Sequence, residues 1–405
     1  MHLSLRQWLR VSFFNLLLIA LIGIILRYKI AFSLPFIDQK YLLHGHSHFA
    51  FAGWISQALM ALLIANLSER QGRNYFIKYQ WVLYANLLTA YGMLLTFPFI
   101  GYAFLSILFS TLSVFVSYAF AFLFWKDLNK AKTPNISNAW YKFALICNVV
   151  SSIGPFSLAY MMAAKSIQQN WYLASVYFFL HFQYNGWFFF ACMGLLCYQL
   201  HELNIPVHTL KRIYQLFACA FFPALFLSLL WWPIPIWLYA IVIAAAVSQL
   251  AGLLLLASTI RHHINELKKK FSPLSRYLLA LCLIAFTIKL FLQAGSVFPA
   301  LSKLAFGFRP IVIGYLHLVL LGVISIFILG YVLALNYISI TKAVKAGVIV
   351  FISGILLNET LLMTQGVADI NYTGIPFINI LLLAAATVMF TGIFILNLGL
   401  RHLRK

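Results

Sequence analysis

Three histidines occupy alternate positions at the start of one apolar segment, in the run His44-Gly-His46-Ser-His48. An imidazole is costly to bury in lipid and normally has a partner there. A metal ion, a haem iron and a proton path are the partners that histidine most often serves. This segment is therefore the first place in the chain where chemistry is expected.

Helical phase divides the three histidines between two faces. Successive residues of an α-helix turn by about 100°, so His44 and His48 share one face while His46 points nearly the opposite way. One helix could thus serve two sites, or one face could coordinate while the other forms hydrogen bonds.

The composition predicts a polytopic membrane protein. Hydrophobic residues make up 63% of the 405 positions and charged residues only 9%, whereas charged residues are about 25% of soluble domains. Apolar runs of about 20 residues are long enough to cross the hydrocarbon core as helices. No polar stretch is long enough to form a separate soluble domain, so we expect a single transmembrane domain over residues 1–405 in a lipid bilayer.

We predict an all-α fold with twelve transmembrane helices. The predicted spans are 9–31, 44–67, 76–98, 101–125, 139–164, 171–200, 212–231, 236–260, 275–297, 310–336, 343–366 and 374–400.

The net charge of +21 is explained by where the basic residues lie, and we expect no nucleic-acid partner. Most lysines and arginines are at the two termini and in the loops that follow the even-numbered spans. The positive-inside rule places these segments in the cytoplasm. We therefore expect a multi-pass protein of the inner (plasma) membrane with both termini cytoplasmic, a topology that requires an even number of spans.

This topology brings the residues that are most costly in lipid into one layer, in the outer half of the membrane. At 1.5 Å of rise per residue, Lys289 and Glu359 reach that layer from helices that run opposite to the histidine-bearing ones. Such groups rarely gather inside a membrane without a function, although Lys289 and Glu359 could simply form an ion pair. The seven residues are His44, His46, His48, His181, Lys289, His317 and Glu359.

Polar neighbours accompany His181 in span 171–200. Tyr177, His181, Tyr184 and Asn185 form one stripe on a helix. Asn185 could orient His181, as outer-shell groups do for metal ligands, or the two could be only a hydrogen-bonded pair.

The tenth span carries a second arrangement of this kind. Tyr315 and His317 point to different faces of the predicted helix. Gly314 and Gly322 would allow a flat ligand or another helix to approach closely.

Three short motifs resemble the catalytic subunit of the haem-copper oxidases (cytochrome c oxidase subunit I) and its distant relatives. His46-Ser-His48 followed by Gly53-Trp54 resembles their H-x-H-x4-G-W pattern at the start of helix two. It is similar also to the H-x-H-x4-G run of the NnrS membrane proteins linked to nitric-oxide stress. The run from Ile313 to Gly322 resembles the oxidase helix-ten motif, and the run from His181 to Trp187 resembles the helix-six motif. Twelve helices with both termini inside is the oxidase core topology.

The resemblance implies one low-spin haem b, with His48 and His317 as its axial ligands. Arg309 and Lys289 would then pair with the haem propionates, and His181 would stand at the position of the helix-six copper ligand. Two imidazole ligands favour electron transfer over gas binding. The implied functions are electron transfer, divergent oxygen or nitric-oxide chemistry, or gas sensing, with an electron-donor subunit or cytochrome as partner.

Two departures from the oxidase pattern leave the binuclear centre incomplete. The span 212–231 has no histidine where the oxidases have a pair, and Tyr315 stands where they have the ligand of the high-spin haem. His44 and His46 could complete a rearranged metal site with His181, so copper or a second haem is left open.

The alternative from another class is a proton-coupled secondary transporter, in which the histidines and Glu359 form a relay. It predicts a repeat that relates the first six helices to the last six. The oxidase-like interpretation predicts three arcs of four helices instead. A degenerate subunit that holds no cofactor is a third possibility.

Overall fold

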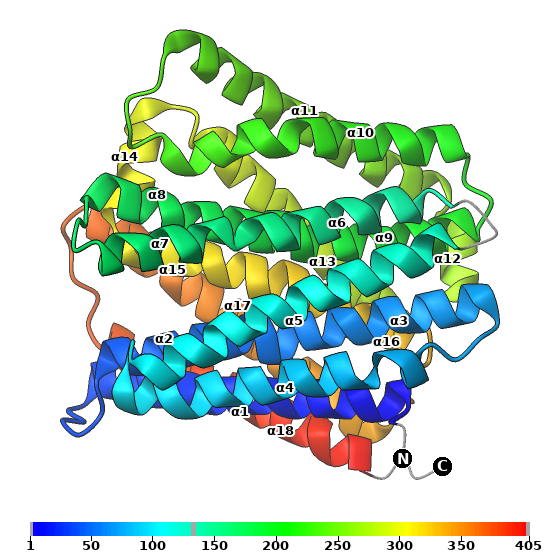
Figure 1. The fold of residues 1–405 in the computed structure, drawn as a ribbon, viewed down its shortest axis with the longest axis horizontal. Helices are drawn as coiled ribbons and strands as arrows, with labels where there is room; N and C mark the ends of the chain where they lie inside the picture. The colour runs from blue at the N-terminus through cyan, green and yellow to red at the C-terminus, as the bar shows by residue number, and fades with distance from the viewer. Residues whose placement is uncertain (1–2, 131–134, 402–405) are drawn as a thin grey trace. The chain divides into compact units, whose positions relative to one another are not determined.

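In the computed structural model the chain forms helices joined by short loops, with no β-strand in its described part (Figure 1). The structure describes residues 3–130 and 135–401, with only the backbone given for 303–306 and 401. Eleven helices in these ranges are long and apolar enough to cross a membrane. The all-α class and the polytopic membrane character predicted from composition are therefore confirmed.

The helical elements are, in chain order, α1 (Leu5–Ala31), α2 (Gln39–Phe49), η1 (Ala50–Ser56), α3 (Gln57–Gln71), α4 (Phe76–Ile100), α5 (Phe104–Asn129), α6 (Ser137–Ser151), α7 (Ile153–Ala163), α8 (Gln169–Leu180), η2 (His181–Phe188), α9 (Phe189–His201), α10 (Val207–Ala224), η3 (Leu225–Leu229), α11 (Ile236–His262), α12 (Ile264–Lys270), α13 (Pro273–Gly295), α14 (Pro299–Gly307), α15 (Arg309–His317), η4 (Leu318–Ser325), α16 (Ile326–Ala334), α17 (Lys342–Ile370) and α18 (Ile378–Arg401). The elements η1, η2 and η4 are π-helices, and η3 is a 3₁₀-helix.

One predicted span differs from the others in how far the structure supports it. Span 171–200 forms one continuous helix, made of α8, η2 and α9, but it is not among the eleven apolar spans. Polar residues such as His181, Gln183 and Asn185 interrupt its apolar run. Twelve spans therefore stay a prediction, with eleven supported by length and hydropathy.

The chain divides into two compact units, each described here by itself. Unit 1 comprises Met1–Phe122 and Ile328–Lys405, and unit 2 comprises Leu123–Phe327. Unit 1 holds the predicted site residues His44, His46, His48 and Glu359. Unit 2 holds His181, Tyr184, Asn185, Lys289, Arg309, Tyr315 and His317.

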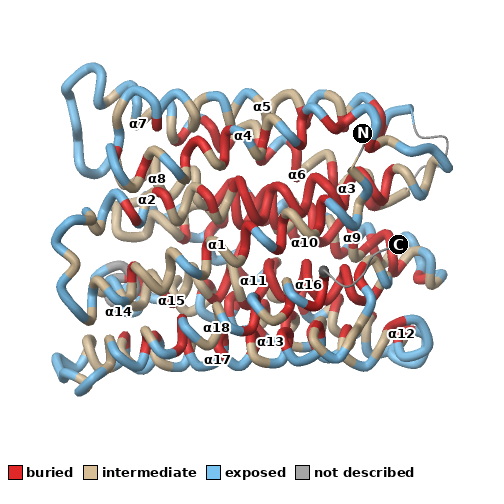
Figure 2. Tube along the Cα trace, turned by 90° about the horizontal axis from the view of Figure 1, so that it is seen from below, coloured by how far each residue is buried: buried red, intermediate tan, exposed pale blue. Residues whose placement is uncertain are grey.

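Unit 1 joins the first and last helices of the chain. In Figure 1, α1 and α18 run side by side, and the Asn397 side-chain amide donates a hydrogen bond to the Phe13 carbonyl oxygen at 3.1 Å. Gly392 lets α18 approach α17 closely, because a Cβ there would overlap the backbone of Phe351. In α3 every residue over 57–67 is buried (Figure 2).

Unit 2 has an aromatic core. Phe143 of α6 packs against Phe190 of α9 with ring centroids 4.4 Å apart, and edge-on against Phe221 of α10 at 5.3 Å. Phe189 of α9 stacks on Phe286 of α13 at 5.1 Å. Offset and edge-to-face rings of this kind stabilise a core beyond their buried area, and here they fix α6 against α9 and α10, and α9 against α13.

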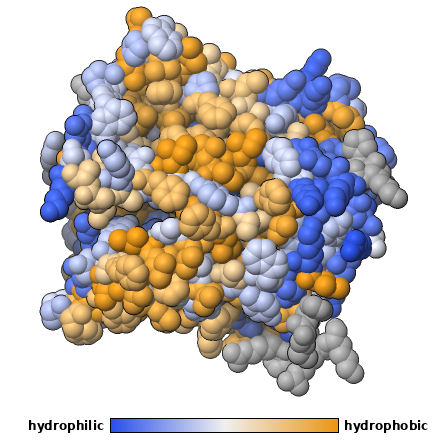
Figure 3. Space-filling view, viewed as in Figure 1, coloured by the Kyte–Doolittle hydropathy of each residue, from blue (hydrophilic) through white to orange (hydrophobic). Residues whose placement is uncertain are grey.

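The surface drawn in Figure 3 is apolar along the middle of the helices, and its hydrophilic residues gather at the helix ends. This distribution is what helices that cross a hydrocarbon layer require, since charged side chains are costly there.

Candidate functional site

His44 and His48 share a face of α2, as helical phase predicts. The His48 ring stacks on Phe97 of α4, with centroids 4.6 Å apart and an interplanar angle of 5°. His44 lies 6.3 Å from the same phenyl ring and meets Tyr102 edge-on at 4.7 Å. Its Nε2 atom is buried and has no hydrogen-bond partner among the described residues. Asp38 caps the start of this helix by accepting from the Tyr41 backbone N–H at 2.9 Å.

His46 lies on the other side of the helix, against α1. A Cβ added to Gly23 would be 3.7 Å from the His46 Cε1 atom. The three histidines therefore do not converge on one point. Within the described residues, no group of three or more His, Cys, Asp or Glu side chains is arranged to hold a metal ion.

The helix that carries His48 changes to π-helix two residues later, at Ala50. Where bonding changes from i→i+4 to i→i+5, some carbonyl oxygens lose their usual donor and need another. Asn15 of α1 donates to the Gly53 carbonyl at 2.5 Å, and Tyr91 of α4 in turn donates to the Asn15 side-chain oxygen at 2.7 Å.

A second amide supports the same π-segment from α4. Asn86 donates to the Ala52 carbonyl at 3.0 Å and to the Gln57 side-chain oxygen at 2.7 Å. Asn15, Asn86 and Gln57 are all buried. The π-helical backbone that follows His48 is thus held by hydrogen bonds from side chains of α1 and α4, within unit 1.

His181 is fully buried and is the first residue of η2. Asn185, four residues on, lies with its amide nitrogen 3.2 Å from the His181 Nδ1 atom, as the predicted i, i+4 pair requires. The Nε2 atom lies 3.0 Å from the carbonyl oxygen of Phe221 in α10. A carbonyl can only accept, so Nε2 carries the hydrogen and Nδ1 accepts from Asn185.

The reason for the second bond lies in α10. After Pro223 the helix tightens into the 3₁₀-helix η3, and the Leu225 N–H donates to Phe222 rather than to Phe221. The Phe221 carbonyl thereby loses its helical donor, and His181 supplies a replacement. Both ring nitrogens of His181 are therefore engaged, and a metal at this residue would have to displace one of these bonds.

His317 ends α15 and is followed at once by the π-helix η4. Its Nδ1 atom lies 2.9 Å from the Ile313 carbonyl oxygen. Nδ1 must therefore donate, which leaves the lone pair of the neutral ring on Nε2. Within η4, Ser325 donates to the Leu320 carbonyl at 2.7 Å, and Cys282 of α13 donates to the Val323 carbonyl at 3.3 Å.

The same pattern thus occurs three times: a histidine, a π-segment that begins within two residues of it, and a glycine five residues after it. The three pairs are His48 with Gly53, His181 with Gly186, and His317 with Gly322. They fall in the second, sixth and tenth predicted spans, at intervals of roughly a third of the chain. The H-x4-G spacing is visible in the sequence at all three places, although it was not recognised there as a repeat.

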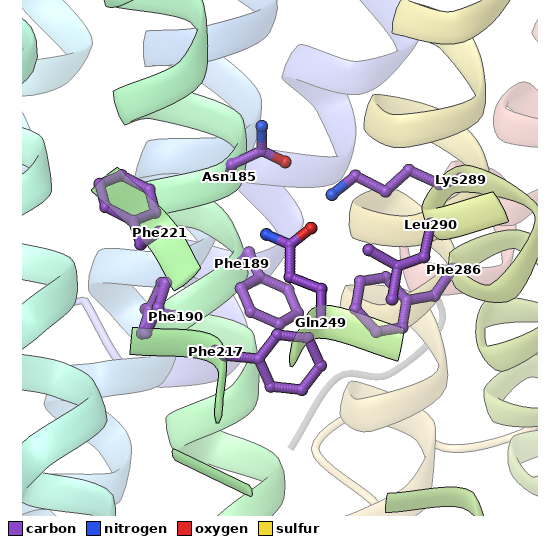
Figure 4. Close-up of a pocket in the computed structure, with 9 residues that line it drawn as sticks. All are labelled: Asn185, Phe189, Phe190, Phe217, Phe221, Gln249, Phe286, Lys289 and Leu290. Carbon is purple, nitrogen blue, oxygen red and sulfur yellow. The ribbon is translucent and has the colours of Figure 1, made fainter. Parts of the chain in front are cut away.

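Lys289 of α13 is only 5% exposed and lies in unit 2 beside Asn185 (Figure 4). Its Nζ atom is 5.7 Å from the centre of the Phe286 ring. The cavities that flank it each have a volume of about 10 Å³, which is room for about one water molecule. Gln249 of α11, which the sequence did not indicate, lines one of them.

Two phenols of unit 2, those of Tyr184 and Tyr315, lie together. The rings of Tyr184 and Tyr315 are 6.3 Å apart, and their hydroxyl groups are hydrogen-bonded. Tyr184 also lines the second of the cavities beside Lys289. The structure therefore brings Tyr184, Asn185, Lys289 and Tyr315 into one neighbourhood.

The remaining predicted site residues have other surroundings. Arg309 is exposed at the first turn of α15. Glu359 of α17 accepts a hydrogen bond from the Asn358 amide at 3.0 Å and interacts electrostatically with Arg27 of α1. The ion pair between Lys289 and Glu359 that the sequence left open would join the two units, and the contacts within each unit leave it untested.

The helices and their hydropathy define a multi-pass helical membrane protein. No protein-family model matches the chain, and no curated protein is detectably similar to it.

Proposed function

We propose that this chain is a membrane haem protein that binds one haem b, with His48 and His317 as the axial ligands. The observation that carries the proposal is the threefold recurrence of histidine, π-segment and glycine in the second, sixth and tenth predicted spans. π-segments inside α-helices occur frequently at functional sites. A recurrence every four helices favours the oxidase-like organisation over the two six-helix halves of a transporter.

The tautomer of His317 supports its role as a ligand. Haem iron binds the lone pair of a neutral imidazole, and the other ring N–H is commonly held by a carbonyl. The bond from His317 Nδ1 to the Ile313 carbonyl provides that arrangement within a single helical turn.

The surroundings of His48 support the same role. Its ring is held in place by stacking on Phe97, and among the described residues no hydrogen bond is recorded to either of its nitrogens. A ring oriented by packing alone keeps a nitrogen for a ligand bond. The buried amides of Asn15 and Asn86 stabilise the backbone that follows it.

A haem held by two imidazoles supplies one-electron transfer when bound, because both axial positions of the iron are filled. Arg309 is the candidate for pairing with a propionate. Lys289 is left out of this role, since the cavities beside it are smaller than a carboxylate. Copper does not fit the residues present, because both nitrogens of His181 are engaged and no three-ligand group occurs in the described ranges.

The proposal includes a location and a partner. Both termini lie in the cytoplasm and the protein resides in the plasma membrane, since most basic residues fall on the side of the termini. An electron-donor subunit or cytochrome would deliver the electrons, because a protein with a single haem receives them from another redox protein.

The test is a reduced-minus-oxidised optical spectrum of the protein purified from haem-replete cells. We expect a sharp b-type alpha band that is lost in His48→Ala and in His317→Ala. The matched control is His208→Ala, because His208 is exposed at the start of α10 and its removal should leave the band unchanged. A colourless wild-type protein, or a band retained in both ligand variants, would overturn the proposal.

A further inference from the structure

Two buried polar side chains in unit 2 line one small cavity without a hydrogen bond to each other or to any other described residue of that unit. They are Lys289, 5% exposed, and Gln249, 7% exposed. Figure 4 shows the Lys289 ammonium group reaching into the space between the Gln249 and Asn185 amides. Buried polar groups in native proteins normally form hydrogen bonds. The Lys289 and Gln249 side chains therefore need a partner inside the cavity, since the surrounding residues do not supply one.

Charge narrows the identity of that partner. A buried ammonium costs several kcal/mol unless an opposite charge is paired with it. Unit 2 contains three carboxylate side chains, Asp127, Glu202 and Glu266, and none of them forms an ion pair with Lys289. A water molecule would satisfy hydrogen bonds here but would leave the charge unbalanced, whereas an anion would do both.

The donors are suited to an anion. Lysine has three N–H donors. In Figure 4 the Gln249 side-chain oxygen lies on the side of Lys289, and the flipped orientation of this amide, which occupies the same space, places its N–H₂ group there instead. Asn185 is different, because its amide nitrogen is held by His181, and its oxygen faces Lys289 in Figure 4. The rings of Phe189, Phe217 and Phe286 also line the cavity.

Size narrows the choice further. The cavity has a volume of about 10 Å³, which corresponds to one water-sized occupant. Carboxylates, phosphate and sulfate are too large for it. A halide is close to this size.

We propose that the cavity formed by Lys289, Gln249 and Asn185 is a binding site for a single halide ion, chloride under ordinary conditions. The ion accepts hydrogen bonds from Lys289 Nζ and the Gln249 amide and balances the buried charge. It thereby stabilises the contact of α13 with α9 and α11. The site does not depend on the haem proposal.

The test is thermal unfolding of the full chain in detergent, followed by tryptophan fluorescence, as chloride replaces gluconate at constant ionic strength. Because a ligand that binds only the folded state raises its stability in proportion to ln(1 + [L]/Kd), we expect a rise in Tm that follows this dependence. Bromide should act as chloride does, and sulfate should have no effect. A wild-type Tm that is independent of chloride would overturn the proposal in favour of a neutral, hydrated lysine.

Variants locate the effect. Lys289→Met, which keeps the length of the side chain without its charge, should abolish the chloride dependence, and Gln249→Leu should weaken apparent affinity by about tenfold or more. Lys268→Met, at an exposed position of α12, is the matched control and should respond as the wild type does. An unchanged response in Lys289→Met would contradict the site.

A direct observation covers the case in which Lys289→Met does not fold. Crystals of the wild-type chain grown in bromide should show an anomalous peak within hydrogen-bonding distance of Lys289 Nζ. Strong bromide peaks elsewhere with none at Lys289 would reject the proposal.

Discussion

The Nδ1 atom of His317 donates to the carbonyl oxygen of Ile313, 2.9 Å away and one turn earlier in α15. This bond leaves the lone pair on Nε2, which is the tautomer that a ligand to iron needs. At His181, Nε2 donates to the Phe221 carbonyl and Nδ1 accepts from Asn185, so the ring has the other tautomer. Two histidines at the same position of the repeated motif thus differ in which ring nitrogen carries the hydrogen.

We predict that His181 stabilises the fold and holds no metal. His181→Ala leaves the Phe221 carbonyl and the Asn185 amide without partners in a buried site, and each unsatisfied group costs about 1–3 kcal/mol. The Tm should fall while iron and copper contents per chain stay at the wild-type level. Elemental analysis beside thermal unfolding checks this, with exposed His262→Ala as control. Loss of a stoichiometric metal in His181→Ala would show that the residue is a ligand.

The hydrogen-bond network that follows His48 predicts two variants with different losses of stability. Asn15→Ala removes the donor to the Gly53 carbonyl and the acceptor for Tyr91, so we expect a destabilisation of about 1–3 kcal/mol. Tyr91→Phe removes only the outer bond and should cost about 0.5–1.5 kcal/mol. Thermal unfolding of both single variants and of the double variant measures the coupling energy between Asn15 and Tyr91. Equal losses in the two single variants would contradict the order of the network.

The glycines of the repeated motif predict a contrast between two alanine variants. A Cβ at Gly186 would lie 2.5 Å from the Cβ of Cys147, so Gly186→Ala should destabilise the fold by about 1–3 kcal/mol through overpacking. At Gly295 the nearest atom would be 3.9 Å away, and Gly295→Ala should be neutral or slightly stabilising. The Tm values of the two variants decide the point. A tolerated alanine at Gly186 would mean that α6 can move away from η2.

Topology is tested with reporter fusions. A fluorescent protein fused after the last residue should fold and fluoresce, because we place the C-terminus in the cytoplasm. Alkaline phosphatase fused at Phe36, in the exposed loop after α1, should be active, and the same enzyme fused at Gly72 should be inactive. The reverse pattern at these two loops would invert the topology.

Span positions were predictable from sequence because length and hydropathy decide them. Every predicted span coincides over most of its length with a helix or a run of consecutive helices and extends at most four residues beyond it. The contact of Asn185 with His181 follows from i, i+4 spacing. The π-segments were not predictable, because a regular turn of 100° per residue does not hold where the bonding changes to i→i+5. They depend on donors from other helices, such as Asn15 for Gly53 and Cys282 for Val323.

Contacts between helices distant in sequence were also beyond prediction. The bond from His181 to Phe221 depends on the tightening of α10 after Pro223, which hydropathy does not encode. Lys289 was recognised as costly in lipid, but nothing in one sequence pairs it with Gln249 on another helix. The haem ligands and the oxidase resemblance stay predictions, since no contact in the structure tests them.

The electron paramagnetic resonance spectrum of the oxidised, purified protein tests the central claim most directly. We predict a low-spin ferric signal from one haem with two imidazole ligands, replaced by a high-spin signal or lost in His317→Ala and in His48→Ala. A protein without haem, or a wild-type haem that is high-spin, would contradict the assignment of His48 and His317 as axial ligands.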